Sequence, residues 1–218
     1  MSRLQPEYIE INSWPFRVSR PVSDSDEKRT LLLLHGHLGN ENVIWILTSP
    51  LPEDYLLLAP RAPNKIGPNQ FSWHEIGPQW PTLQDYQKLT QQLLDRVEEF
   101  SNLNNYLSPK IDIMGFSQGA SVAYALAFLH PERVGKIAAL AGFIPEIWKS
   151  ENKWGSLNNK KFFIAHGIQD DIVPFQKAQK AKDWLEDQGA NVTFCPSDTG
   201  HKLNSQCLKG LGEFFKSD

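Results

Sequence analysis

The chain has little of what would tie it to nucleic acid, to a membrane or to export. Among its 218 residues the charges nearly cancel, and the net charge at pH 7 is −3. Such a balance gives no reason to expect a nucleic acid or an anionic membrane surface as a partner. No apolar run approaches the length of a bilayer span, and residues 1–20 lack the basic start and apolar stretch of a secretory signal. We therefore predict a cytoplasmic protein with no membrane span.

Cysteine is also scarce, and the chain has only Cys195 and Cys207. The two could pair, but in a chain of this size without an export signal they are more often reduced, buried thiols. We expect free thiols. Nothing in the composition indicates disorder or a repeat array, and the length suits one large domain with a substantial core. We expect residues 1–218 to form a single domain.

Short apolar runs alternate with helical patterns along most of the chain. Near its start, residues 8–11 and 14–18 alternate in polarity like two short strands at an antiparallel edge. Continuous apolar runs, typical of strands buried on both faces of a parallel sheet, follow at residues 30–34, 55–59, 111–114, 137–140, 162–165 and 191–195.

Between these runs, apolar residues recur at steps of three and four, as on one face of a helix. The pattern covers residues 83–100, 178–185 and 208–215. Strands that alternate with helices predict an α/β fold, with a doubly wound, mostly parallel sheet and helices on both faces. In such sheets, functional sites form at the carboxyl ends of the strands.

One of the predicted strands leads directly into Gly-Phe-Ser-Gln-Gly at residues 115–119, and a long apolar segment follows at residues 120–129. This order is typical of a nucleophile elbow, in which a serine sits in a strained turn between a strand and a buried helix. Glycine stands two residues to either side because bulkier side chains would clash there. The turn places the serine at a helix N-terminus, which favours a developing negative charge. We predict that Ser117 is a nucleophile.

A serine nucleophile needs a histidine base, which comes last in the chain order of an α/β-hydrolase, after the serine and the acid. Of the six histidines, only His201 lies beyond the acidic residues that follow the predicted strand at 162–165. It stands in a polar loop between the last strand and the last helix, where a general base can swing toward Ser117. We predict that His201 is this base.

The acid is expected in the loop after the predicted strand at 162–165, which contains Asp170 and Asp171. Its role would be to hold the imidazole in the correct tautomer and to stabilise the imidazolium. Either aspartate could instead cap the helix that Pro174 opens. The residues alone leave the choice between the two aspartates open.

An oxyanion hole requires two backbone donors close to the nucleophile. One is expected to be the N–H of Gln118, directly after the serine, and the other to come from the loop at residues 35–39. Within that loop we favour the N–H of His37.

The chain resembles the phospholipase/carboxylesterase family of serine hydrolases, which includes the acyl-protein thioesterases. The resemblance runs from about Thr30 to Phe215. It rests on Leu-His-Gly at residues 34–36, Ala-Pro-Arg-Ala-Pro at 59–63, Gly-Phe-Ser-Gln-Gly-Ala at 115–120, His-Gly-x-x-Asp-x-x-Val-Pro at 166–174 and Gly-His at 200–201. It implies an α/β-hydrolase fold with a minimal cap, and a carboxylesterase or acyl-thioesterase acting on small to medium acyl chains.

The resemblance also selects one of the two aspartates. Asp170 stands four residues after His166, which is where the family places its triad acid. The family's mechanism implies an acyl-enzyme intermediate on Ser117 and no cofactor or metal. The implied partner is a small-molecule or lipid-like ester or thioester.

Aromatic residues in the connecting segments indicate an apolar groove for the acyl chain. Trp73 is the best candidate for a substrate contact, and Phe143 is the second. Residues 143–157 are a candidate for a small cap over the site. The other aromatic residues in these segments are Trp45, Trp80, Trp148 and Trp154.

Two other classes of protein stay open at this point. His35 and His37, with Asp170 and His201, have the residue types of a metal-dependent hydrolase. His35 at a buried strand end is more often structural, and Gly36 interrupts the strand that would give both histidines one face. A non-catalytic binding protein with an α/β-hydrolase-like fold is the other class, but it would not need a serine, an aspartate and a histidine in this order.

Overall fold

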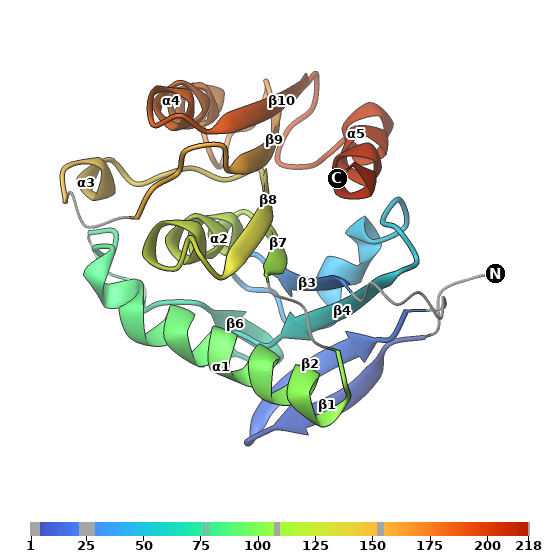
Figure 1. Ribbon diagram of the computed structural model, residues 1–218. Coiled ribbons are helices and arrows are strands. Elements are labelled where there is room, and N and C mark those ends of the chain that lie inside the picture. Colours follow the sequence, from blue (N-terminus) through green and yellow to red (C-terminus); the bar gives the residue numbers. More distant parts are fainter. Residues whose placement is uncertain are drawn as a thin grey trace.

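The computed structural model describes residues 5–21, 29–75, 77, 79–106, 110–151 and 155–217. Its centre is an eight-stranded sheet with the strand order β1-β2-β4-β3-β7-β8-β9-β10 (Figure 1). Neighbouring strands from β4 to β10 pair in parallel, whereas β2 pairs antiparallel with both β1 and β4. The strands are β1 (Glu7–Ile11), β2 (Trp14–Ser19), β3 (Arg29–Leu34), β4 (Tyr55–Pro60), β7 (Ile111–Phe116), β8 (Val134–Leu140), β9 (Lys161–Gly167) and β10 (Asn191–Ser197).

The residue pattern explains the two kinds of strand. β3 and β4 are almost completely buried, as their unbroken leucine runs predict for strands covered on both faces. β1, at the edge, is mostly exposed. The turn between β1 and β2 consists of Asn12 and Ser13, with φ angles of 46° and 63°, and two positive φ values in a row suit a tight hairpin. The predicted antiparallel edge and the predicted parallel pairing are confirmed, but β10 is not buried on both faces as its apolar run suggested, because it lies at the other edge of the sheet.

Helices cover both faces of the sheet, as predicted (Figure 1). Side chains of α1 (Gln87–Leu103), α2 (Gln118–Leu129) and α4 (Phe175–Asp187) share one apolar cluster with alternate residues of β3, such as Leu32. α5 (Ser205–Lys216) and the 3-10 helix η1 (Val43–Leu47) pack in a second cluster, with Leu31 and Leu33. Because successive strand residues point to opposite faces, the two clusters lie on opposite sides of the sheet.

The structure adds short elements that the sequence pattern did not predict. The segment around Phe71 contains a hairpin of β5 (Asn64–Gly67) and β6 (Gln70–Ser72), separate from the main sheet, and α1 is preceded by the 3-10 helix η2 (Gln84–Tyr86). In the candidate cap, α3 (Glu146–Lys149) is a single helical turn, and its Trp148 is fully buried in the core. Trp154 lies outside the described residues, as do residues 22–28 between β2 and β3.

The expectation of free thiols is wrong, because Cys195 and Cys207 form a disulfide. Cys195 lies near the end of β10 and Cys207 in the first turn of α5. The loop between them folds back and brings their Cα atoms to 5.8 Å, which is within the range that a disulfide can bridge. Composition alone could not reveal this proximity. The cross-link encloses His201, and closing a loop of this size is worth about 3 kcal/mol in the chain-entropy account.

Over the described ranges, no helix combines the length and the apolar character needed to cross a bilayer.

Candidate active site

Ser117 occupies the sharp turn between β7 and α2. Its backbone has φ 53° and ψ −116°, a conformation that costs a serine about 1–3 kcal/mol. The flanking glycines make the turn possible: a Cβ on Gly115 would lie 2.1 Å from the carbonyl oxygen of Gly119, and a Cβ on Gly119 would lie 2.2 Å from that of Leu34. The turn thus has the strained backbone of a nucleophile elbow, and both glycines are needed for the reason the sequence indicated.

Two backbone segments lie beside Ser117 where oxyanion donors are expected. Gln118 begins α2, and its side-chain Oε1 accepts a hydrogen bond from the N–H of Trp73 at 2.9 Å. On the other side, a Cβ on Gly36 would lie only 3.3 Å from the Cβ of Ser117. The loop that follows Gly36, with His37 exposed in it, therefore begins directly beside the serine.

Asp170 and His201 form a hydrogen-bonded pair. His201 Nδ1 lies 2.7 Å from Asp170 Oδ2, and the aspartate side chain is fully buried whereas that of the histidine is 21% exposed. The other oxygen, Oδ1, accepts the N–H groups of Ile172 at 3.0 Å and Val173 at 2.9 Å. Burial opposes ionisation of Asp170, but the hydrogen bonds from Val173 and His201 outweigh it and lower the pKa of the carboxyl group. Asp171, by contrast, is exposed.

The loop with His201 lies against both the acid loop and the elbow. The N–H of Gln169 donates to the carbonyl of Thr199 at 2.9 Å, which ties the two loops together. The His201 ring lies 5.0 Å from the ring of Phe116, the residue before the serine. The structure records no hydrogen bond between Ser117 Oγ and any described residue, and catalytic hydrogen bonds often form only when substrate is bound.

A second histidine supports the acid, and in the sequence it stands out only as part of the motif at residues 166–174. His166 Nε2 lies 2.8 Å from the carbonyl oxygen of Val173 and 3.3 Å from Asp170 Oδ2. Because a carbonyl oxygen can only accept, Nε2 must carry the proton. Burial lowers the pKa of His166, so its ring is neutral. The bond from His166 to the Val173 carbonyl holds the turn whose Val173 N–H donates to Asp170. The sequence feature that could have identified this role is the position of His166 at the end of β9, four residues before Asp170.

His35 has a structural role. Its Nδ1 lies 2.7 Å from the carbonyl oxygen of Gly36, and its Nε2 accepts the N–H of Ala62 at 3.0 Å. Both ring nitrogens are therefore engaged, and burial lowers the pKa of the ring to about 4. In the part of the chain that the structure describes, no group of three or more His, Cys, Asp or Glu side chains could hold a metal ion. Since both of its ring nitrogens are bonded to backbone groups, His35 is not free to bind a metal.

The two candidate substrate contacts lie in different surroundings. Trp73 is buried, its indole N–H donates to the carbonyl of His35 at 2.7 Å, and its side chain forms part of the wall of a cavity of about 550 Å³. Phe143 is half-buried in the segment after β8. Its ring packs against that of Trp80 at 4.8 Å, and Lys177 Nζ lies 4.3 Å from the ring centre.

The comparisons of this chain with known proteins agree on one family. Residues 21–217 match the model of the phospholipase/carboxylesterase family. A probable carboxylesterase, SOBER1-like, of Arabidopsis thaliana is 28% identical over 88% of this chain and 80% of its own length. Acyl-protein thioesterase 1 of Candida albicans is 26% identical over 90% of this chain and 95% of its own length.

Solved structures give the same fold. A carboxylesterase of Bacillus cereus superposes with a TM-score of 0.81 at 22% identity, over 94% of both chains. A carboxylesterase of Mesorhizobium loti also reaches a TM-score of 0.81, at 18% identity, over 99% of this chain and 100% of its own. The eight-stranded, mostly parallel sheet with its helices is thus an α/β-hydrolase fold.

Proposed function

Since this chain belongs to the phospholipase/carboxylesterase family and is an ester or thioester hydrolase, we propose that it acts through a triad of Ser117, His201 and Asp170. One observation carries the proposal: the buried Asp170 carboxylate is hydrogen-bonded to His201, whose ring lies next to the strained turn of Ser117. A buried carboxylate that orients an imidazole beside a nucleophile elbow is the arrangement that activates a serine.

In the first half-reaction, Ser117 Oγ attacks the carbonyl carbon of the substrate while His201 Nε2 takes the serine proton. The negative charge that develops on the carbonyl oxygen is stabilised by the N–H groups of Gln118 and His37. His201 then gives the proton to the departing alkoxide or thiolate as the C–O or C–S bond breaks. The acyl group is left as an ester on Ser117.

In the second half-reaction, water attacks this ester. His201 takes a proton from the water, and it returns that proton to Ser117 Oγ as the carboxylic acid leaves. The Asp170 carboxylate stays ionised in both halves, because its hydrogen bonds lower its pKa. It keeps the proton of neutral His201 on Nδ1, so that Nε2 is free to accept.

The substrate that this site suits is an ester or thioester of a small to medium acyl chain, in a small-molecule or lipid-like compound. Phe143 and Trp73 are the proposed apolar contacts for the acyl chain. Phe143 packs with Trp80, and its carbonyl accepts the hydroxyl of Ser121 in α2, the helix that follows the elbow. Trp73 is joined to the elbow through its N–H, which donates to the side chain of Gln118. The cavity that Trp73 lines has neither Ser117 nor His201 in its wall, so it is not assigned to the acyl chain.

A fluorophosphonate probe tests the triad proposal directly. It should attach to Ser117 of the purified protein, and mass spectrometry of the peptides should locate the adduct there. Lack of labelling at Ser117 in a folded preparation would leave a non-catalytic binding protein as the better reading. A panel of esters and thioesters of graded acyl length, run on the same preparation, gives the acyl preference. Full activity in the presence of a strong chelator would exclude a metal-dependent mechanism.

Hydrolysis should rise with pH between about pH 5 and pH 8, because only a neutral imidazole can accept the serine proton. The lowered pKa of Asp170 keeps that carboxyl ionised over this range, so the acid of the triad does not contribute to the rise. The measurement is kcat/KM for one neutral ester across the range. A flat profile would contradict a histidine base.

We also propose that the chain is one domain, since residues 21–217 match a single family model.

A cytoplasmic location stays a prediction. Disulfides are rare in the cytosol, so in that compartment we expect Cys195 and Cys207, which are bonded in the structure, to be reduced. Alkylation of the protein as isolated from cells, before and after reduction, measures the state of the two thiols.

A further inference from the structure

The loop from His35 to Glu41 carries the N–H of His37 that we assign to the oxyanion hole. Its middle is attached to β6 by two backbone hydrogen bonds. The N–H of Leu38 donates to the carbonyl of Phe71 at 3.1 Å, and the N–H of Phe71 donates to the carbonyl of Gly39 at 3.0 Å. These two bonds fix the residues just after His37. The direction of the His37 N–H also depends on how the two ends of the loop are held.

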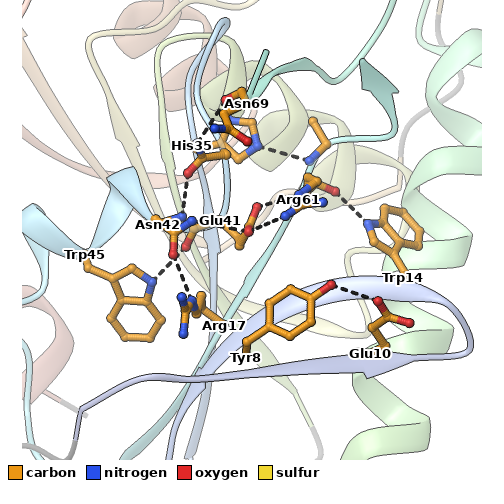
Figure 2. A network of polar contacts seen from close by, with 12 residues as sticks. Tyr8, Glu10, Trp14, Arg17, His35, Glu41, Asn42, Trp45, Arg61 and Asn69 are labelled. Carbon is orange, nitrogen blue, oxygen red and sulfur yellow. Dashed lines mark hydrogen bonds and ion pairs between the residues drawn. The ribbon is translucent and has the colours of Figure 1, made fainter. Parts of the chain in front are cut away.

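The far end of the loop is held by an ion pair. Glu41 is only 2% exposed, and its two carboxylate oxygens accept Nε of Arg61 at 2.7 Å and Nη2 at 2.6 Å (Figure 2). Burial opposes ionisation of Glu41, but the bonds from Arg61 outweigh it and lower the pKa of the carboxyl group. A two-point pair of this kind sets the direction of the carboxylate as well as its distance.

Arg61 is itself fixed to the sheet, so it can serve as an anchor. Its N–H donates to the carbonyl of Pro15 at 3.0 Å, and its carbonyl accepts the indole N–H of Trp14 at 2.6 Å (Figure 2). Its guanidinium lies 4.8 Å from the centre of the Phe71 ring. The ion pair therefore connects the loop to β2 and to the same β6 residue that binds the middle of the loop.

The two ends of the loop are held by consecutive residues. Arg61 binds Glu41, and the next residue, Ala62, donates its N–H to His35 at 3.0 Å. One rigid segment after β4 thus sets the distance between the start and the end of the loop. With both ends and the middle fixed, the loop has little freedom to turn the His37 N–H away from Ser117.

We propose that the ion pair of Glu41 and Arg61 positions the oxyanion donor of His37. The inference rests on the proposed function, because it assigns the pair to the stabilisation of an oxyanion formed by Ser117. Neither residue touches the reacting atoms. Breaking the pair releases one end of the loop while the His35 and Phe71 contacts remain, so the donor is displaced rather than lost.

Glu41→Gln in the full chain tests the proposal. The amide has nearly the shape of the carboxylate, but its NH₂ must face a guanidinium N–H, so one of the two bonds is replaced by a donor facing a donor. Because removing an oxyanion donor costs about 10²–10³ in kcat, displacing one should lower kcat by about 10- to 100-fold, with KM changed less than about threefold. Arg61→Lys, which keeps the charge but not the two-point geometry, should act in the same direction.

A trifluoromethyl ketone gives a readout that a merely structural role would not move. Ser117 Oγ adds to its carbonyl carbon, His201 takes the proton, and the resulting oxyanion occupies the hole. Its inhibition constant should weaken in Glu41→Gln by about the same factor as kcat. The concentration of active protein is taken as the amount of Ser117 that a fluorophosphonate labels when the reaction is complete. Unfolded protein is thereby left out of the kinetic values.

Asp112→Asn is the matched control. Asp112 is also a largely buried acid paired with an arginine, since its Oδ2 lies 3.5 Å from Arg29 Nη2, but it stands at the opposite end of β7 from the elbow. The Asp112→Asn substitution should lower thermal stability, while kcat and the inhibition constant of the ketone, both per labelled serine, should stay unchanged. Unchanged values in Glu41→Gln, or equal losses in both variants, would overturn the positioning role. If the wild-type serine is not labelled at all, the proposed function itself fails.

Discussion

Replacing Ser117 by alanine should lower kcat by a factor on the order of 10⁶, the loss seen when the nucleophile of a serine hydrolase is removed. Alanine lacks the oxygen that forms the acyl-enzyme, and water held by the remaining groups is a poor substitute. The fold should persist, because alanine at φ 53° is no more strained than serine and the flanking glycines are unchanged. The measurement is hydrolysis of a chromogenic ester by the purified variant, with circular dichroism to check the fold.

Ser121→Ala is a suitable control for this experiment. Ser121 lies one turn further along α2, is buried, and donates through its hydroxyl to the carbonyl of Phe143 at 3.1 Å. Its replacement removes a serine hydroxyl from the same helix without touching the elbow, so kcat should fall by less than about tenfold. If pure Ser117→Ala retains more than about 1% of wild-type hydrolysis, another residue is the nucleophile.

The elbow could be predicted because its constraint is local. Gly115 and Gly119 are needed for steric reasons within one turn, and the buried strand before them and apolar helix after them are readable as continuous patterns. The same holds for the parallel strands, since a run such as that of β3 has no polar face to leave in water. Short-range rules of this kind place Ser117 without knowledge of the rest of the fold.

Features that depend on distant segments could not be predicted in this way. Cys195 and Cys207 meet because the loop between β10 and α5 folds back, and no local pattern encodes that path. Glu41 reads in the sequence as an ordinary loop acid, and only the fold brings Arg61 to it. The β5–β6 hairpin was missed because its strands are short and flanked by proline and glycine, which favour an irregular connection.

The choice between the two aspartates came from family resemblance, and the structure supplies physical grounds for it. Asp170 is buried against His201, while Asp171 is exposed and bonded to neither histidine of the site. The possibility that one of the aspartates caps the next helix is not what the structure shows. Asp170 itself binds the N–H groups of Ile172 and Val173, and Pro174, at the N-cap of α4, has no side-chain cap.

Asp170→Asn should lower kcat by up to about 10⁴, as in a protease triad where the same change leaves the histidine in the wrong tautomer. The structure gives the reason. The N–H groups of Ile172 and Val173 both point at Oδ1, so the asparagine must keep its oxygen there and turn its NH₂ toward His201. That NH₂ can only donate, so Nδ1 becomes an acceptor and the ring proton moves to Nε2. His201 then cannot take the proton of Ser117.

Asp171→Asn is the internal control, because it makes the same chemical change one residue away at an exposed side chain. It should alter kcat by less than about twofold and stability by less than about 0.5 kcal/mol, as is usual for surface substitutions. Steady-state kinetics of both variants, at the pH where the wild type is most active, decide the assignment. The opposite ranking would transfer the triad role to Asp171. Equal and small losses would mean that the imidazole is oriented by the backbone contacts of its loop, such as the bond from Gln169 to Thr199, and needs no carboxylate.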